Sequence, residues 1–317
     1  MHKALLLYNP ASGTRREARA QQVARIAQVF RSAGVELETC VTTHSGSATQ
    51  QAQAGATAGF DTIIVCGGDG TVNVAMNGLV LSGSQAALGV VPLGSGNLLA
   101  SDLGLPANPV AAAKALLKYT PREIRPGFLD YQQKTSPQRR NFIVAAGVGA
   151  DAELMYRTAA SSKHRFGRMA YFIEMARMTR YGKFPMFDVE WKDEQDQLHR
   201  DQVSLAMAIR ARSFPGLLRF VNLESAITRD DFRLLLFRTN KVRHFLNYFA
   251  SVASGRNWNV QQVNVVFSRW FRCSNSGPND IHCEADGEAL GRLPVEGGID
   301  ERTFRLLMPA EQLAAGK

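Results

Sequence analysis

The stretch VCGGDGTVNVAMNGL, residues 65–79, passes from apolar β-formers to a pattern of helical spacing through three glycines, an aspartate and a threonine. Glycines allow positive φ and let backbone N–H groups approach a phosphate. The helix predicted from residue 72 would direct its positive end at the same point. Asp69 fits such a loop through a bound Mg²⁺ or as the acceptor of a hydroxyl proton, because a carboxylate repels phosphate. Taken alone, the stretch is also compatible with a tight structural turn.

Strand-like and helix-like segments alternate through the first third of the chain. Strands are predicted over residues 4–8, 35–41, 62–66 and 88–92, and helices over residues 15–33, 45–58, 72–81 and from 96 onward. This alternation is typical of an α/β domain with an open parallel sheet. Ligands of such sheets bind beyond the carboxyl ends of the strands, which is where the glycine-rich stretch falls.

Two further polar turns follow strands of the same predicted sheet. One is PLGSGN, residues 92–97, and the other begins with NPAS, residues 9–12. Because the carboxyl ends of parallel strands meet at one edge, the three turns predict a single nucleotide site. Its expected residues are Asn9, Ser12, Gly67, Gly68, Asp69, Gly70, Thr71, Gly94, Ser95, Gly96 and Asn97. The chain has no GxxxxGK[ST] motif and no GxGxxG after the first strand, which argues against a Walker-type NTPase and a dinucleotide-binding Rossmann domain.

The pattern changes after Pro121, where strand-like stretches become more frequent and crossover helices become rare. Strands are predicted over residues 124–131, 141–146, 187–191, 203–210, 232–237 and 263–272, with helical insertions over 164–181 and 241–253. This composition predicts a mainly antiparallel, β-sandwich-like C-terminal domain.

The bulk composition is that of a globular protein of about two domains. The chain has 317 residues, 45% of them hydrophobic, and a formal net charge of +9. The charge favours anionic partners such as phosphorylated metabolites or an acidic membrane. The four cysteines have no CxxC spacing, so we expect a reducing cytoplasm and no metal or disulfide framework. The apolar runs are far shorter than the roughly 20 residues that span a bilayer.

Taken together, the motifs resemble the diacylglycerol kinase catalytic-domain family, which includes bacterial diacylglycerol and related lipid kinases and sphingosine kinases. Phosphofructokinases and NAD kinases are more distant relatives with a similar GGDG loop. The resemblance is carried, in order along the chain, by residues 9–13, 67–71, 94–106, 146–151 (AGVGAD) and 284–288 (EADGE).

The resemblance implies a lipid kinase that uses ATP and Mg²⁺ and transfers the γ-phosphoryl group to a lipid hydroxyl at an interdomain cleft. It implies an ATP-binding α/β domain, phosphofructokinase/NAD kinase-like, of residues 1–123 and 299–317, and a lipid domain of residues 124–298. In that family Asp286 would be the base that deprotonates the hydroxyl, with Glu288 supporting it. Asp69 would act on the metal and is the competing choice for the base.

Three carboxylates that are common in the family are missing from this chain, at Ser47, Val74 and Leu98. Their absence makes a catalytically weak or inactive nucleotide- or lipid-binding regulator the alternative from another functional class. A sphingoid-base kinase and an NAD kinase are further alternatives. Diacylglycerol or a related lipid alcohol is the preferred acceptor.

Several segments combine apolar and basic residues in a way that suits a membrane surface. They are residues 169–183, residues 241–256 and the apolar loop 214–220, although helices of this kind more often pack one face on a sheet. The expected partners are a lipid substrate and an anionic membrane surface, without nucleic acid, and a homodimer is left open. We therefore expect a cytoplasmic protein of phospholipid biosynthesis that associates peripherally with membranes.

Overall fold

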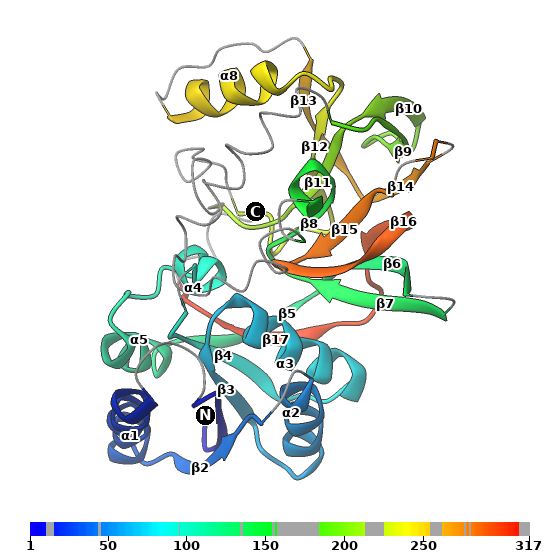
Figure 1. The fold of residues 1–317 in the computed structure, drawn as a ribbon. Coiled ribbons are helices and arrows are strands. Elements are labelled where there is room, and N and C mark those ends of the chain that lie inside the picture. The colour runs from blue at the N-terminus through cyan, green and yellow to red at the C-terminus, as the bar shows by residue number, and fades with distance from the viewer. Residues whose placement is uncertain are drawn as a thin grey trace. The chain divides into compact units, whose positions relative to one another are not determined.

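The computed structural model describes most of the chain as two compact units. The described residues are 1–10, 16–43, 46–94, 96–133, 136–153, 156, 184–212, 225–253, 262–275, 277–278 and 280–310. One unit comprises Met1–Pro126 with Glu301–Lys317, and the other comprises Gly127–Asp300 (Figure 1). Five predicted features lie outside the described residues: Ser12, Ser95, the helix predicted over 164–181, the apolar and basic segment 169–183 and the loop 214–220. In the part of the chain that is described, no helix is long and apolar enough to cross a membrane.

The N-terminal unit is built on a six-stranded sheet with the order β2-β1-β3-β4-β17-β5. Its strands are β1 (Lys3–Tyr8), β2 (Glu36–Val41), β3 (Thr62–Gly67), β4 (Ala87–Pro92), β5 (Thr120–Ile124) and β17 (Phe304–Met308). The neighbours pair in parallel except β17 and β5, which are antiparallel. Every residue of β3 and β4 is buried, as expected for continuous apolar runs in a sheet that is covered on both faces.

Helices connect these parallel strands. They are α1 (Arg16–Ser32), α2 (Ser47–Thr57), α3 (Asp69–Ser82), α4 (Leu98–Asp102) and α5 (Pro109–Leu116). The last of these was not predicted, although its start carries a clear signal. The Asn108 side chain accepts from the backbone N–H groups of Val110 and Ala111, and Pro109 occupies the first turn. An asparagine cap followed by proline is a typical helix start.

The C-terminal unit is an antiparallel sheet of eleven strands that includes the order β10-β9-β14-β16-β15-β8-β11-β12-β13, with β6 pairing with β16 and β7. The strands are β6 (Gly127–Gln133), β7 (Ser136–Phe142), β8 (Ala145–Gly149), β9 (Phe187–Lys192), β10 (Leu198–Val203), β11 (Leu205–Ile209), β12 (Phe232–Phe237), β13 (Val263–Ser268), β14 (Trp270–Ser274), β15 (His282–Ala285) and β16 (Glu288–Ile299).

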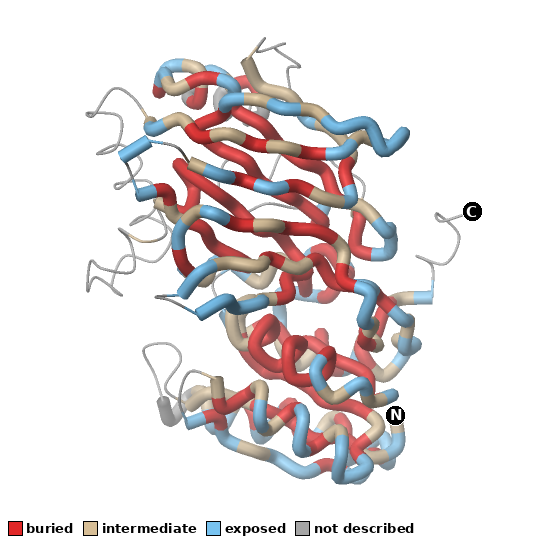
Figure 2. The backbone as a smooth tube through the Cα atoms, turned by 90° about the vertical axis from the view of Figure 1, so that its right-hand side faces the viewer, coloured by how far each residue is buried: buried red, intermediate tan, exposed pale blue. Residues whose placement is uncertain are grey.

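The strands of this sheet enclose one core and leave a second apolar face for a helix. Phe271 on β14 and Phe232 on β12 lie far apart in the strand order, yet their rings meet edge to face at 5.7 Å. This packing across the core agrees with the predicted sandwich-like character. On the other face, Phe245 of α8 (Val242–Ala253) stacks on Phe237 at 4.2 Å. Figure 2 shows the buried residues running through the strands of each unit.

Four of the predicted strands are each divided between two strands. The stretches 124–131, 141–146, 203–210 and 263–272 break near Pro126, at residues 143–144, at Ser204 and at Arg269. At Ser204, for example, the chain leaves its pairing with β9 and joins β8 and β12 as β11. An apolar run shows that a stretch is extended, but it does not show where the stretch changes its hydrogen-bonding partner.

Candidate functional site

The two glycine loops of the N-terminal unit lie in contact with each other. A Cβ added to Gly94 would lie 2.5 Å from the Cα of Gly68, and one added to Gly68 would lie 3.2 Å from the Cα of Gly94. The backbone N–H of Leu93 donates to the carbonyl of Gly67 at 2.9 Å. Glycine is required at this crossing because any side chain would push the two backbones apart. The adjacent strands β3 and β4 therefore deliver both loops to one small region of the sheet edge.

Asn97 shapes the second loop from within. It has a positive φ of 50° and precedes α4. Its Oδ1 accepts from the backbone N–H of Gly94 at 2.8 Å, and its Nδ2 donates to the carbonyl of Gly94 at 2.7 Å. These two bonds close the loop, while the backbones of Gly94 and Gly96 remain exposed. An anion at this edge would meet exposed backbone on the second loop.

The carboxylate of Asp69 connects the two loops. Asp69 is the first residue of α3, and its Oδ1 accepts from the backbone N–H of Leu99 at 3.2 Å. Its Oδ2 lies 2.9 Å from the position that a Cβ would take at Gly96. Burial raises the pKa of Asp69, and the backbone N–H groups at the start of α4 oppose that shift. The acid of the GGDG motif thus holds the loops together by bonds to the second loop's helix.

The other predicted residues of this edge take the following places. The Thr71 side chain folds over Gly67, and Gly70 lies in the first turn of α3. Asn9 follows β1, whose last residue Tyr8 pairs with Cys66 of β3, so it lies at the same sheet edge. The structure therefore brings most of the predicted nucleotide site together within one unit, with Ser12 and Ser95 outside the described residues.

Asp286 occupies the turn between β15 and β16 in the C-terminal unit. Its φ is 47°, in the left-handed region, which aspartate tolerates better than most residues. Its carboxylate accepts from the backbone N–H groups of Ile143 at 3.0 Å and of Val144 and Ala145 at 2.9 Å each. The side chain is 8% exposed. These donors fix the carboxylate in one orientation and stabilise its charge.

A second carboxyl group is buried beside Asp286. Glu284 is almost fully buried, and its Oε2 accepts from the backbone N–H of Gly287 at 2.8 Å. A Cβ at Gly147 would lie 2.9 Å from Oε1 of Glu284 and 3.1 Å from Oδ2 of Asp151. Burial, together with the negative charge of Asp151, raises the pKa of Glu284 well above its usual range. No role was predicted for Glu284 itself, although its spacing of two from Asp286 is that of one strand face.

Glu288, the other acid of this motif, forms an ion pair with Arg140 on β7. The Glu288 side chain is about a third exposed, which makes it more accessible than Asp286. Arg140 was not among the predicted site residues. The two residues are 148 positions apart in the chain. Asp286, two residues before Glu288, is bonded to the backbone of Ile143 and Val144 directly after β7, and this brings the two side chains together.

Nothing in the described part of the chain forms a group of three or more histidine, cysteine or acidic side chains that could hold a metal ion. Of the positions where family members often carry an acid, Val74 is 7% and Ser47 is 3% exposed. Val74 lies in the buried stretch of α3. Among the described residues of the two glycine loops, Asp69 is therefore the carboxylate that is available to a metal ion. A single protein carboxylate is enough for Mg²⁺ that binds together with substrate phosphates.

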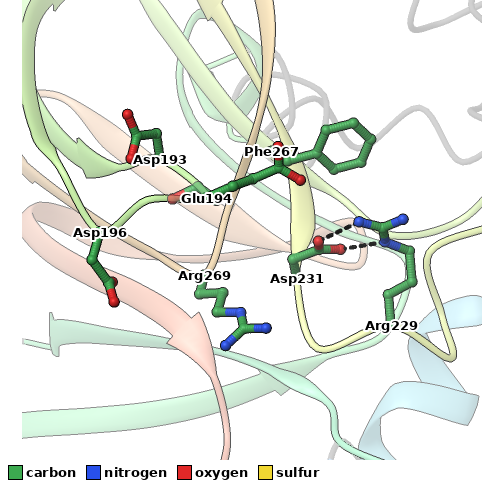
Figure 3. Close-up of a pocket in the computed structure, with 8 residues that line it drawn as sticks. Asp193, Glu194, Asp196, Arg229, Asp231, Phe267 and Arg269 are labelled. Carbon is green, nitrogen blue, oxygen red and sulfur yellow. Dashed lines mark hydrogen bonds and ion pairs between the residues drawn. The ribbon is translucent and has the colours of Figure 1, made fainter.

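A separate pocket of about 330 Å³ lies in the C-terminal unit at the β9–β10 turn and the ends of β12 and β13 (Figure 3). Arg229 points toward Asp231 and forms a two-bond ion pair with it. The Asp193 side chain is bonded to His199 and to the backbone of its own turn. None of the predicted site residues lines this pocket.

Known proteins resemble this chain over nearly its whole length. Residues 3–129 match the family model described as the diacylglycerol kinase catalytic domain. A diacylglycerol kinase of Bacillus subtilis (strain 168) is 28% identical over 98% of each chain. One of Staphylococcus aureus (strain MRSA252) is 25% identical over 97% of this chain and 92% of its own.

Solved structures show the same fold. The crystal structure of a diacylglycerol kinase from Bacillus anthracis str. Sterne has a TM-score of 0.69 and 18% identity, with 98% of each chain covered. Two further structures from that organism reach TM-scores of 0.76 and 0.75 at 20% identity. The matched segment contains both glycine loops, whose contact is described above. Residues 3–129 of this chain are therefore similar to the diacylglycerol kinase catalytic domain.

Proposed function

We propose that this protein is an ATP-dependent lipid kinase that transfers the γ-phosphoryl group to the hydroxyl of diacylglycerol or a related lipid alcohol. The observation that carries the proposal is the pair of touching glycine loops, joined by Asp69, at the edge of a parallel sheet. These loops lie in the segment that matches the catalytic-domain family. The similarity to diacylglycerol kinases over 98% of the chain supports the choice of a lipid acceptor.

In this proposal the glycine loops bind the phosphates of ATP. Backbone N–H groups of the two loops and the positive end of α3 would face the anion. Asp69 would hold Mg²⁺, which supplies charge neutralisation on the phosphates when it is bound. The contact between Gly68 and Gly94 sets the spacing of the two loops, and the Asn97 bonds hold the second loop closed. The protein's own contribution is mainly positioning, which suits phosphoryl transfer.

Asp286 and Glu288 are the proposed residues for the acceptor hydroxyl. The three N–H donors that fix Asp286 give it the defined orientation that a hydroxyl-positioning group requires. Phosphoryl transfer through a loose transition state demands little proton abstraction, so the role does not need a strong base. Glu288, which is more exposed and paired with Arg140, would support Asp286.

Incubation of the protein with γ-labelled ATP, Mg²⁺ and a panel of acceptors tests this proposal. The panel contains diacylglycerol, a sphingoid base, other lipid alcohols and NAD. We expect label in diacylglycerol or another lipid alcohol, with loss of transfer in Asp69→Asn. Label in the sphingoid base would redirect the proposal to that class of lipid, and label in NAD would contradict it.

A regulator that binds nucleotide or lipid without turnover is the second candidate, and one observation favours it. The carboxylates expected to do chemistry are each engaged by the protein: Asp69 by α4, Asp286 by three backbone N–H groups and Glu288 by Arg140. The acids often found at positions 47, 74 and 98 are replaced by serine, valine and leucine. ATP binding without transfer to any acceptor in the same panel would select this candidate.

The proposed substrate is insoluble in water, so the protein would have to meet a membrane surface. We propose a cytoplasmic protein that associates peripherally with anionic membranes and serves phospholipid biosynthesis. The net charge of +9 supports attraction to such a surface. Sedimentation with vesicles of anionic or neutral lipid tests this, and the expected result is cosedimentation with the anionic vesicles that weakens as salt is raised. Analytical ultracentrifugation tests whether the protein is a homodimer.

A further inference from the structure

Arg19 of α1 reaches across to the second glycine loop. Its Nη1 donates to the backbone carbonyl of Leu93 at 3.0 Å, although the two residues are 74 positions apart. The same Leu93 donates its N–H to the carbonyl of Gly67 at 2.9 Å. Leu93 therefore connects the Arg19 guanidinium on one side with the start of the first glycine loop on the other. The three groups lie within a single unit of the fold.

The positive charge of Arg19 also acts on the strand that leads into the first loop. Burial raises the pKa of the Cys66 thiol, and the charge of Arg19 opposes that shift. Cys66 directly precedes Gly67 at the carboxyl end of β3. The contact with Leu93 and the electrostatic effect on Cys66 agree on the position of the guanidinium charge. Both place it where β3 and β4 end and the glycine loops begin.

The glycine loops lack a cation of their own. Neither GGDGT, residues 67–71, nor PLGSGN, residues 92–97, contains a lysine or arginine, and Asp69 adds a negative charge. Backbone N–H groups and a helix end supply only partial charge, about half an elementary charge per helix. A nucleotide polyphosphate carries several full negative charges. A guanidinium matches phosphate well, because its fixed fork of N–H donors can form two parallel bonds to the oxygens.

We propose that Arg19 binds the phosphate groups of the nucleotide and supplies the full positive charge that the glycine loops lack. This inference rests on the proposed function, since it assumes that a nucleoside polyphosphate binds at the loops. The bond to the Leu93 carbonyl orients the guanidinium, and so the charge is held beside the loops before the nucleotide arrives. Arg19 is thus a nucleotide-binding residue outside the glycine motifs.

Calorimetric titration of the full-length protein with ATP and with adenosine tests the inference. Arg19→Gln removes the charge, Arg19→Lys keeps it without the fork, and Arg25→Gln is the matched control because Arg25 is exposed on the same helix. We expect Arg19→Gln to weaken ATP binding about tenfold or more and to leave adenosine binding unchanged. Arg19→Lys should fall between Arg19→Gln and the wild type, and Arg25→Gln should match the wild type. The loss of ATP affinity on adding salt should also be shallower in Arg19→Gln.

Two results would overturn the inference while leaving the proposed function intact. One is an Arg19→Gln protein that binds ATP as tightly as Arg25→Gln. The other is an Arg19→Gln protein that loses ATP binding and adenosine binding equally. That result would mean that Arg19 only stabilises the loop that follows Leu93 and does not contact phosphate. A wild-type protein that binds no ATP would overturn both the inference and the proposed function, so the wild-type titration separates the two cases.

Discussion

Substituting Gly94 by alanine should separate the two glycine loops. The new Cβ would lie 2.5 Å from the Cα of Gly68 and 2.9 Å from Oδ1 of Asn97. The nearer of these atoms belongs to backbone and cannot rotate away, so one or both loops must move. Overpacking of this kind costs about 1–3 kcal/mol of unfolding free energy. Because the displaced atoms belong to the proposed phosphate site, ATP affinity should fall along with stability.

Gly83→Ala is the control for this experiment. Gly83 ends α3 with a φ of +59° and has nothing within 4 Å of its Cβ position, so alanine there adds backbone strain without crowding. That strain costs roughly 1–2 kcal/mol. Urea denaturation followed by circular dichroism, together with ATP titration, should show both variants destabilised and only Gly94→Ala impaired in binding. If Gly94→Ala had wild-type stability and wild-type ATP affinity, the loops could not touch as described.

Three further predictions concern the acids of the C-terminal unit. Burial raises the pKa of Glu284 in the folded protein above its value in the unfolded protein. The proton on Glu284 therefore stabilises the fold fully at a pH below the unfolded-state pKa, and this stabilisation is lost as the pH rises through the folded-state pKa. Glu284→Gln should therefore flatten the fall in unfolding free energy that urea denaturation shows as the pH rises above the usual pKa of a glutamate. Asp286→Asn should lower that free energy by about 1–3 kcal/mol, since an amide cannot accept all three N–H bonds, one of them from Ile143. Glu288→Gln, whose side chain is a third exposed, should change it by less than about 1 kcal/mol in the same assay.

The sequence predicted those parts of the fold that depend on local pattern. The mainly apolar runs 62–66 and 88–92 indicated buried parallel strands, and they form most of β3 and β4. The glycines after each strand indicated turns at one sheet edge, because parallel topology brings such turns together. The antiparallel character of the second unit followed from its many short strands with few crossover helices. These are properties of neighbouring residues, which a sequence displays directly.

The contacts that join distant residues were not predictable in this way. Arg140 meets Glu288 because the turn that holds Asp286 is bonded to the backbone directly after β7. The bond from Arg19 to Leu93 depends on how α1 lies beside β4, and nothing in the spacing of either segment encodes it. The hydrogen bond from the N–H of Leu99 to Asp69 was not predictable either. The motif suggested that Asp69 is a metal ligand or a base, but it did not suggest that Asp69 links the two loops.

The most direct test of the central claim follows the γ-phosphate of ATP. The wild-type protein is mixed with γ-labelled ATP, Mg²⁺ and vesicles that contain diacylglycerol, and the lipid is extracted and counted. The account predicts label in the extracted lipid for the wild type and a strong reduction for Gly94→Ala, in which the loops are forced apart. ATP that binds to the wild-type protein but leaves no label in the lipid would contradict the claim that this protein is a lipid kinase.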